Sequence, residues 1–225
     1  MNNILAVTDI ARDCKTNIAL DEVFFTEEDF KPIIRFYTWT KPAYTIGYFQ
    51  KYSQLNNQNN YDIVRRLTGG LAVLHNKDLS YSFIVSSEQW EYIYNQEETY
   101  KIIHTEMKKS LYDIGIKCDE NQAENKTPNN FSCVNTFYKD DIFLEGRKLI
   151  GSCQRRRGKR LLVEGSIHLQ MTQEQIVKFT DSFFYKISSF LNGKIIKSSL
   201  ENSYLNKADI LIKNKYNNDK WVKLF

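Results

Sequence analysis

Hydrophobic residues recur at every third or fourth position in three segments of the chain, a spacing typical of helices with one buried face. We predict these helices over residues 15–25, over residues 97–114, and from Thr172 onward. Thr16 is the expected N-cap of the first helix, and Gly115 follows the second helix as a residue type that often ends helices. Gln175 lies three residues after Thr172, which is the spacing of a capping box.

Shorter apolar runs, several of them alternating with polar residues, predict β-strands between these helices. Turn residues separate neighbouring runs, as at Lys41-Pro42 and at Glu145-Gly146-Arg147. A short additional helix is expected near residues 207–213. The expected strands cover residues 33–39, 43–49, 63–66, 79–85, 141–144, 148–151 and 160–168.

These elements indicate an α+β fold in one domain over residues 1–225, with a mixed, mainly antiparallel sheet flanked by helices that lie mostly on one side. The core is expected over about residues 10–190, followed by a short helical tail. The chain has 225 residues, enough for one sizeable core, and its 42% hydrophobic and 14% aromatic content is that of an ordered protein.

Charge and cysteine content narrow the classes of function. A net charge of +4 is too small for a dedicated nucleic-acid binder but fits an acidic protein partner. The chain has no apolar signal segment and no long apolar run, so we expect a cytoplasmic protein without a membrane partner. The cysteines show no CxxC spacing, and we expect them to be thiols: Cys14, Cys118, Cys133 and Cys153.

The histidines do not indicate a metal site. His104 is expected on the polar side of its helix, and His168 within a strand, and neither has a cysteine or carboxylate partner at metal-ligand spacing. We expect neither a metal nor a cofactor.

The segment from Val64 to His75 combines two arginines, a Gly-Gly pair and a histidine between two strand-like runs. Gly69 and Gly70 would allow close backbone approach, and the guanidinium groups of Arg65 and Arg66 suit a phosphate or carboxylate. A hairpin turn with solvated arginines is the alternative. We favour a structural role for the His75 imidazole over a role as general base.

Two further residues are candidates for catalysis. Cys133 follows a polar loop, where a thiol can be exposed and reactive, although most isolated cysteines are buried small hydrophobes. Lys148 enters an apolar run after a turn, so its ammonium could lower a thiol pKa or hold an acyl oxygen. An edge-strand lysine that prevents aggregation is the alternative. The basic residues 151–160 form either a solvated hairpin tip or a docking site for an acidic protein.

Four motifs occur in the order found in the biotin/lipoate protein ligase superfamily, over roughly residues 10–190. The chain most resembles the cysteine-dependent octanoyl-[acyl carrier protein]:protein octanoyltransferases of that superfamily. The motifs are N-x-A-L-D-E at residues 17–22, R-F-Y-x-W with P-x-x-x-I-G-Y-F-Q at residues 35–50, V-R-R-x-T-G-G-x-x-V-L-H-x-x-x-L-x-Y-S at residues 64–82, and C-(x)14-K-x-x-G-S-x-Q-R at residues 133–155.

The resemblance implies a catalytic domain of this superfamily and an acyl transfer in two steps. The Cys133 thiolate would take an octanoyl group from octanoyl-acyl carrier protein, and a lysine of a lipoyl domain, such as the glycine cleavage H protein, would then attack the thioester. Lys148 would lower the Cys133 pKa and orient the acyl carbonyl. The implied substrate-binding residues are Arg66, Gly69, Gly70, His75, Gly151, Ser152 and Gly165.

Departures from the family pattern leave alternatives open. Glu164 stands where the family often has histidine, and Val134 replaces the common phenylalanine after the cysteine. An ATP-dependent lipoate–protein ligase would use the same motifs, although the tail after residue 190 looks too short for the extra domain such ligases usually need. A lipoyl amidotransferase with the same cysteine, or a non-catalytic binding protein for carrier or lipoyl domains, are further possibilities.

Overall fold

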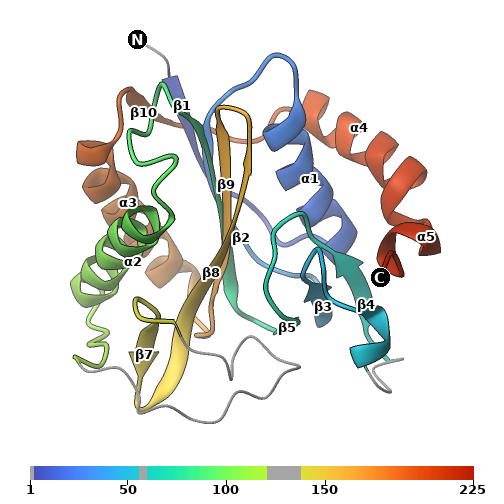
Figure 1. The fold of residues 1–225 in the computed structure, drawn as a ribbon. Coiled ribbons are helices and arrows are strands. Elements are labelled where there is room, and N and C mark those ends of the chain that lie inside the picture. Colours follow the sequence, from blue (N-terminus) through green and yellow to red (C-terminus); the bar gives the residue numbers. More distant parts are fainter. Residues whose placement is uncertain (1–2, 56–59, 121–137) are drawn as a thin grey trace.

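A seven-stranded sheet forms the centre of the molecule, in a computed structural model that describes residues 3–55, 60–120 and 138–225 (Figure 1). Its strand order is β10-β1-β2-β6-β9-β8-β7. β1 pairs in parallel with β10 and β2, and the other pairs are antiparallel, which confirms the mixed, mainly antiparallel sheet. The strands are β1 Asn3–Thr8, β2 Ile33–Tyr37, β6 Leu79–Ser86, β7 Ile142–Leu144, β8 Arg147–Arg157, β9 Arg160–Ile167 and β10 Lys194–Lys197.

A second, three-stranded sheet lies beside the first and has the order β4-β3-β5. Its strands are β3 Ala43–Ile46, β4 Asp62–Arg65 and β5 Val73–His75. β3 pairs in parallel with β4 and antiparallel with β5. The residues between β4 and β5 contain the Gly-Gly pair, so this motif belongs to the smaller sheet.

Helices cover both faces of the central sheet (Figure 1). The expectation that they lie mostly on one side is therefore wrong. Every residue of β2 and β6 is buried, and a strand that is buried on both faces needs cover on both. α2 and α3 contribute to one apolar core, and α1 and α4 to the other. The helices are α1 Cys14–Thr26, α2 Gln96–Asp113, α3 Gln173–Ile187, α4 Asn202–Leu211 and α5 Asp219–Val222.

Helix ends agree with the sequence in two cases and differ in one. Gly115 follows α2 with a φ of 85°, and Thr172 and Gln175 form the capping box of α3. α1 is capped by Asp13 and not by Thr16, because the Asp13 carboxylate accepts hydrogen bonds from the backbone of Lys15 and Thr16. Asp13 also accepts the Thr16 hydroxyl at 2.5 Å.

The sequence predicted the C-terminal tail and the edge strands of the central sheet less well than the other elements. The helix expected near residues 207–213 begins earlier, at Asn202, and a π-helical turn, Ile212–Tyr216, follows it. β1 and β10 pair with each other across most of the chain length, without the local turn that signals a hairpin. Among the described helices, none is long and apolar enough to span a membrane.

A buried polar cluster joins α1 to β2. The Arg35 side chain is fully buried and donates to Asp9 at 2.9 Å and to Asp21 at 3.0 Å. It also donates to the Asn17 side-chain oxygen at 2.7 Å. Asp21 accepts further hydrogen bonds from Tyr37 and Ser82. Asn17 and Asp21 both belong to the N-x-A-L-D-E motif, so in the described structure this motif positions α1 on the sheet.

We expect Arg35→Met to destabilise the fold strongly. The change leaves the Asp21 carboxylate buried without its cation and leaves Asp9 with Arg12 alone, and breaking a buried ion pair typically costs about 3–5 kcal/mol. Urea unfolding measures the difference in free energy. The matched control is Lys41→Met, which removes the exposed ion pair with Asp62 and should leave the unfolding midpoint nearly unchanged. Equal midpoints for the two variants would contradict a structural role of the cluster.

Candidate active site

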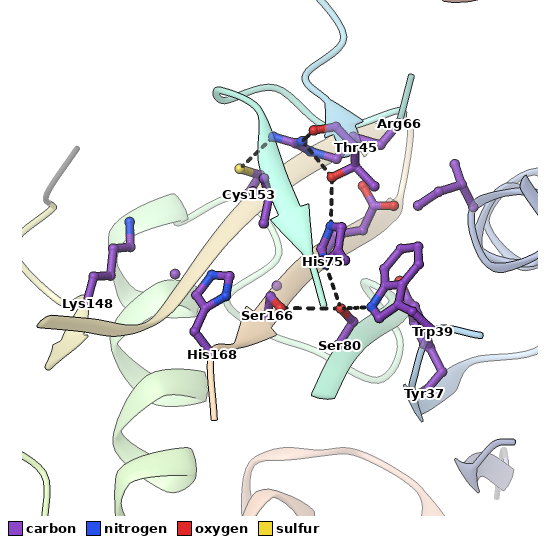
Figure 2. A pocket seen from close by; sticks show the side chains of 15 residues that line it. Tyr37, Trp39, Thr45, Arg66, His75, Ser80, Lys148, Cys153, Ser166 and His168 are labelled. Carbon is purple, nitrogen blue, oxygen red and sulfur yellow. Dashed lines mark hydrogen bonds between the residues drawn. The ribbon is translucent and has the colours of Figure 1, made fainter. Parts of the chain in front are cut away.

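A narrow pocket of about 40 Å³ lies between the two sheets. The smaller sheet and the residues next to it contribute Thr45, Arg66 and His75 (Figure 2). β8, β9 and the residue after β9 contribute Cys153, Glu164, Ser166 and His168 from the opposite side, and Tyr37 and Trp39 come from β2 and its end. Five predicted residues line this one pocket: Lys148, Arg66, His75, Gly151 and Gly165.

Lys148 is held in place by a buried ion pair. Its ammonium lies 2.7 Å from the carboxylate of Asp141, and both side chains are almost fully buried. Asp141 also accepts a hydrogen bond from the Tyr100 hydroxyl at 2.5 Å and one from the Tyr138 backbone. A Cβ atom on Gly151 would lie 2.6 Å from the Lys148 Nζ, so the glycine makes room for the ammonium. The predicted Lys148–Gly151 spacing thus brings a cation to the pocket.

Ser152 is the centre of a hydrogen-bonded chain behind Lys148. The His104 Nδ1 lies 2.6 Å from the Asp140 carbonyl and must donate to it, so Nε2 accepts from the Ser152 hydroxyl at 2.5 Å. The Tyr81 hydroxyl also bonds to Ser152. Burial lowers the pKa of His104 to about 4, which keeps the imidazole neutral at physiological pH. The prediction that His104 faces the polar side of its helix is wrong.

The two arginines of the central motif bind the backbone. Arg65 is fully buried and donates to three carbonyls at residues 47–50 and to the carbonyls of Trp221 and Val222. Arg66 donates to the carbonyls of Gly69 at 2.6 Å, Leu71 at 2.9 Å and Thr45 at 3.2 Å. Arg65 therefore binds backbone carbonyls and does not line the pocket. Arg66 lines the pocket, and its role in binding stays a prediction.

The two glycines of the pair differ in what they approach. Gly70 has a φ of 85°, and a Cβ atom there would lie 2.5 Å from the Cys153 sulfur. A Cβ atom on Gly47 would lie only 1.9 Å from the Gly70 carbonyl oxygen, so β3 and the glycine loop touch through their backbones. A Cβ atom on Gly69 would meet nothing within 4 Å. The close approach is therefore a property of Gly70.

His75 has partners for both ring nitrogens. Nδ1 lies 2.8 Å from Asp78, and Nε2 lies 2.9 Å from the Thr45 hydroxyl. The ring stacks on Trp39 with centroids 4.0 Å apart, and Trp39 donates to the Ser80 hydroxyl at 3.0 Å. These contacts agree with a structural role for the imidazole, which at the same time forms part of the pocket wall.

The basic segment 151–160 is mostly strand and not a hairpin tip. Arg155 donates to the Leu67 carbonyl at 2.7 Å, and Arg156 donates to the Ile93 carbonyl. Only the turn around Gly158 presents exposed basic side chains, at Arg157 and Lys159. The predicted solvated hairpin tip is therefore confirmed only for the turn around Gly158.

An open groove of about 810 Å³ adjoins the pocket, and Cys153 lines both. Gly69, Gly70 and Phe49 lie along the groove from one side, and Tyr100 and Tyr138 from the other. Ser152, a predicted binding residue, also lines the groove. Cys133 lies outside the described residues, so its predicted role as nucleophile stays a prediction.

Sequence reasoning missed several groups at the site, and one of them had a usable signal. The turn at Glu145-Gly146 pairs Leu144 with Arg147, and this register places Asp141 within reach of Lys148. No comparable local signal connects His104 or Tyr81 to Ser152, because these contacts join α2, β6 and β8.

A family model and several relatives match most of the chain. The model of the lipoyl protein ligase A/B catalytic domain matches residues 13–196. Octanoyltransferase LipM of Halalkalibacterium halodurans is 32% identical over 212 residues, which are 88% of this chain and 74% of the relative. Octanoyltransferase LipM of Clostridioides difficile is 34% identical over 209 residues, with 86% and 76% covered.

Solved structures share the fold at lower identity. A bipartite lipoate protein ligase from Thermoplasma acidophilum has a TM-score of 0.72 at 18% identity and covers 100% of this chain and 98% of its own. A lipoate-protein ligase A bound with ATP has a TM-score of 0.72 at 19% identity and covers 100% and 99%. Since residues 13–196 match the family model and the octanoyltransferases match most of the length, the chain belongs to the lipoyl protein ligase A/B catalytic domain family and is an octanoyltransferase, an acyltransferase of protein lipoylation.

Proposed function

We propose that the chain transfers octanoyl from octanoyl-acyl carrier protein to a lysine of a lipoyl domain, such as that of the glycine cleavage H protein, by way of a Cys133 thioester. The observation that carries this proposal is the position of Lys148. Its ammonium is fixed by Asp141 beside Gly151 and lines the narrow pocket, which adjoins the open groove at Cys153. A fixed cation in this pocket suits the carbonyl of an acyl chain that occupies it.

Two balanced steps complete the transfer. The Cys133 thiolate adds to the thioester carbonyl, the carrier's sulfur leaves as a thiolate that takes up a proton, and the octanoyl group stays on Cys133. The neutral ε-amine of the acceptor lysine then adds to this new thioester. The amine loses a proton, Cys133 leaves as a thiolate, and the product is an amide. No ATP is consumed, because a thioester is already an activated acyl group.

The pocket favours a straight chain. At about 40 Å³ it admits an eight-carbon chain only when lining side chains rotate, and a branched chain would require larger movements. The groove, at about 810 Å³, leaves room for the extended arm of a carrier protein in the first step and for a lysine side chain in the second. Both would approach the pocket from the same side, at different times.

The ATP-dependent ligase is the main alternative, and the arginines argue against it. In a nucleotide site the guanidinium groups would be available to phosphate oxygens. Here Arg65 and Arg66 donate to backbone carbonyls of neighbouring segments. A lipoyl amidotransferase would use the same chemistry with a lipoylated protein as donor, and it differs only in the first substrate.

Incubation with octanoyl-acyl carrier protein in the absence of ATP is the decisive experiment. We expect intact-mass spectrometry to show an enzyme heavier by one octanoyl group, because the thioester forms before the acceptor is added. Adding a lipoyl domain should then move the octanoyl mass to that domain.

Two controls separate the alternatives. Free lipoate with ATP should give no modified lipoyl domain, and a modified domain in that tube, with no adduct from the carrier, would instead identify a ligase. A lipoylated H protein as donor tests amidotransfer. If the lipoylated H protein gives an adduct and octanoyl-acyl carrier protein gives none, the first substrate is a lipoylated protein and the enzyme is an amidotransferase.

A further inference from the structure

Glu164 has an unpaired carboxylate oxygen at the surface of the acyl pocket. The residue is 7% exposed, lies on β9 and lines the pocket. Its Oε2 accepts a hydrogen bond from the Thr68 hydroxyl at 2.5 Å. Its Oε1 is buried and has no hydrogen-bond partner in the described part of the chain. Buried acceptors in proteins almost always have a hydrogen-bond partner, so a missing partner is expected here.

The nearest cation does not neutralise this oxygen directly. Arg66 reaches Glu164 only through Thr68, whose hydroxyl accepts from the Arg66 Nε at 3.2 Å and donates to Glu164. The other Arg66 donors go to the carbonyls of Thr45, Gly69 and Leu71 and to neighbouring side chains. Burial, and then the charge of Asp21, raise the pKa of Glu164 to about 7. The surroundings of the carboxyl group therefore disfavour its charged form and leave Oε1 without a donor among the described residues.

Strand register places Glu164 toward the far end of a bound acyl chain. The Lys148 ammonium lies over Gly151, and Cys153 follows on the same face of β8, about 7 Å further along. Glu164 is the direct partner of Cys153 on the neighbouring strand. A chain whose carbonyl lies at Lys148 and which follows this face therefore passes Glu164 within the length of eight carbons.

We propose that Glu164 is a specificity-determining residue whose Oε1 accepts a hydrogen bond from a hydroxyl or thiol near the far end of the acyl chain. This inference rests on the proposed function and adds a second substrate class to octanoyl: eight-carbon acyl groups with a distal hydrogen-bond donor. A plain octanoyl chain also fits, but it leaves the oxygen unpaired against a methyl group. A hydrogen-bond donor on the acyl chain would pair with Oε1 and replace the hydrogen bond to water that the oxygen loses on burial.

The test compares two acyl groups on the same carrier protein, octanoyl and 8-hydroxyoctanoyl, by the ratio of their kcat/KM values in transfer to a lipoyl domain. We expect Glu164→Leu to lower the ratio of hydroxyoctanoyl to octanoyl about 10- to 100-fold, the usual value of one hydrogen bond to a charged group. Glu164→Gln keeps the shape and one acceptor oxygen and should fall between wild type and Glu164→Leu. Glu164→Gln also keeps the test possible if Glu164→Leu does not fold.

Glu106→Gln is the matched control, because Glu106 is also a buried glutamate, at 4% exposure, but pairs with Lys109 and does not line the pocket. Its ratio should equal that of wild type. A ratio that stays within twofold in both Glu164 variants, with octanoyl still transferred, overturns this inference and leaves the proposed function intact. Failure of the wild-type protein to transfer either group refutes the proposed function instead.

Discussion

Octanoyl transfer is expected to fall to the uncatalysed rate when Cys133 is replaced by alanine. Alanine offers no nucleophile, so no acyl-enzyme can form and the second step has no substrate. Cys133→Ser should also be inactive within the assay, because a hydroxyl at neutral pH is a far weaker nucleophile than a thiolate. The readouts are the octanoyl adduct by intact mass and the amount of octanoylated lipoyl domain.

Other cysteines of the chain provide controls for this prediction. Burial raises the pKa of the Cys118 thiol, which makes it a poor nucleophile, so Cys118→Ser should transfer normally. Cys153→Ser is the more demanding control, because Cys153 lines both the pocket and the groove. If Cys133→Ala transfers octanoyl fully and Cys153→Ser does not transfer it, the nucleophile is Cys153 and not Cys133.

Lys148→Met should lower kcat/KM for the carrier substrate about 10²–10³-fold, the usual cost of removing one preorganised electrostatic contact at an acyl centre. Its ammonium is the group that Asp141 holds beside Gly151. Titration of the reactive thiol should show a raised Cys133 pKa, because a nearby positive charge is lost. Arg147→Met is the matched control, since Arg147 is the exposed neighbour on the same strand.

Stability must be separated from chemistry in this variant. Lys148→Met leaves the carboxylate of Asp141 buried without its cation, which itself destabilises the fold. The double variant with Asp141→Asn removes both charges and keeps an acceptor for the Tyr100 hydroxyl. Restored stability with transfer still low assigns the loss to the missing ammonium. Recovery of transfer in the double variant would make Lys148 a structural residue.

The sequence predicted elements whose signals are local. The turn at Glu145-Gly146, the capping box at Thr172 and the glycine after α2 each depend on residues a few positions apart, and all are present. The serines of β6 show what a local pattern does not reveal. Ser80 and Ser82 suggest a solvent-exposed face, yet both are buried, because Ser80 accepts from Trp39 and Ser82 donates to Asp21.

His104 shows the same limit at the site. The periodicity of α2 correctly indicated its apolar face, with Ile103 and Met107 in the core. It could not indicate that the chain before β7 covers a second side of the helix, where the Asp140 carbonyl accepts from His104. Polar residues buried by such long-range contacts look solvent-exposed in a local pattern, and three of the groups around Lys148 and Ser152 are of this kind: Tyr81, His104 and Asp141.

The backbone contact between Gly47 and Gly70 has a consequence for affinity. Because a Cβ atom on Gly47 would lie 1.9 Å from the Gly70 carbonyl, the two segments have no side chain between them that could rotate. Gly70 lines the open groove, so this part of the groove wall is held by backbone packing before any ligand arrives. A preformed wall loses little conformational entropy on binding, so more of the contact free energy is retained as affinity for whatever occupies the groove.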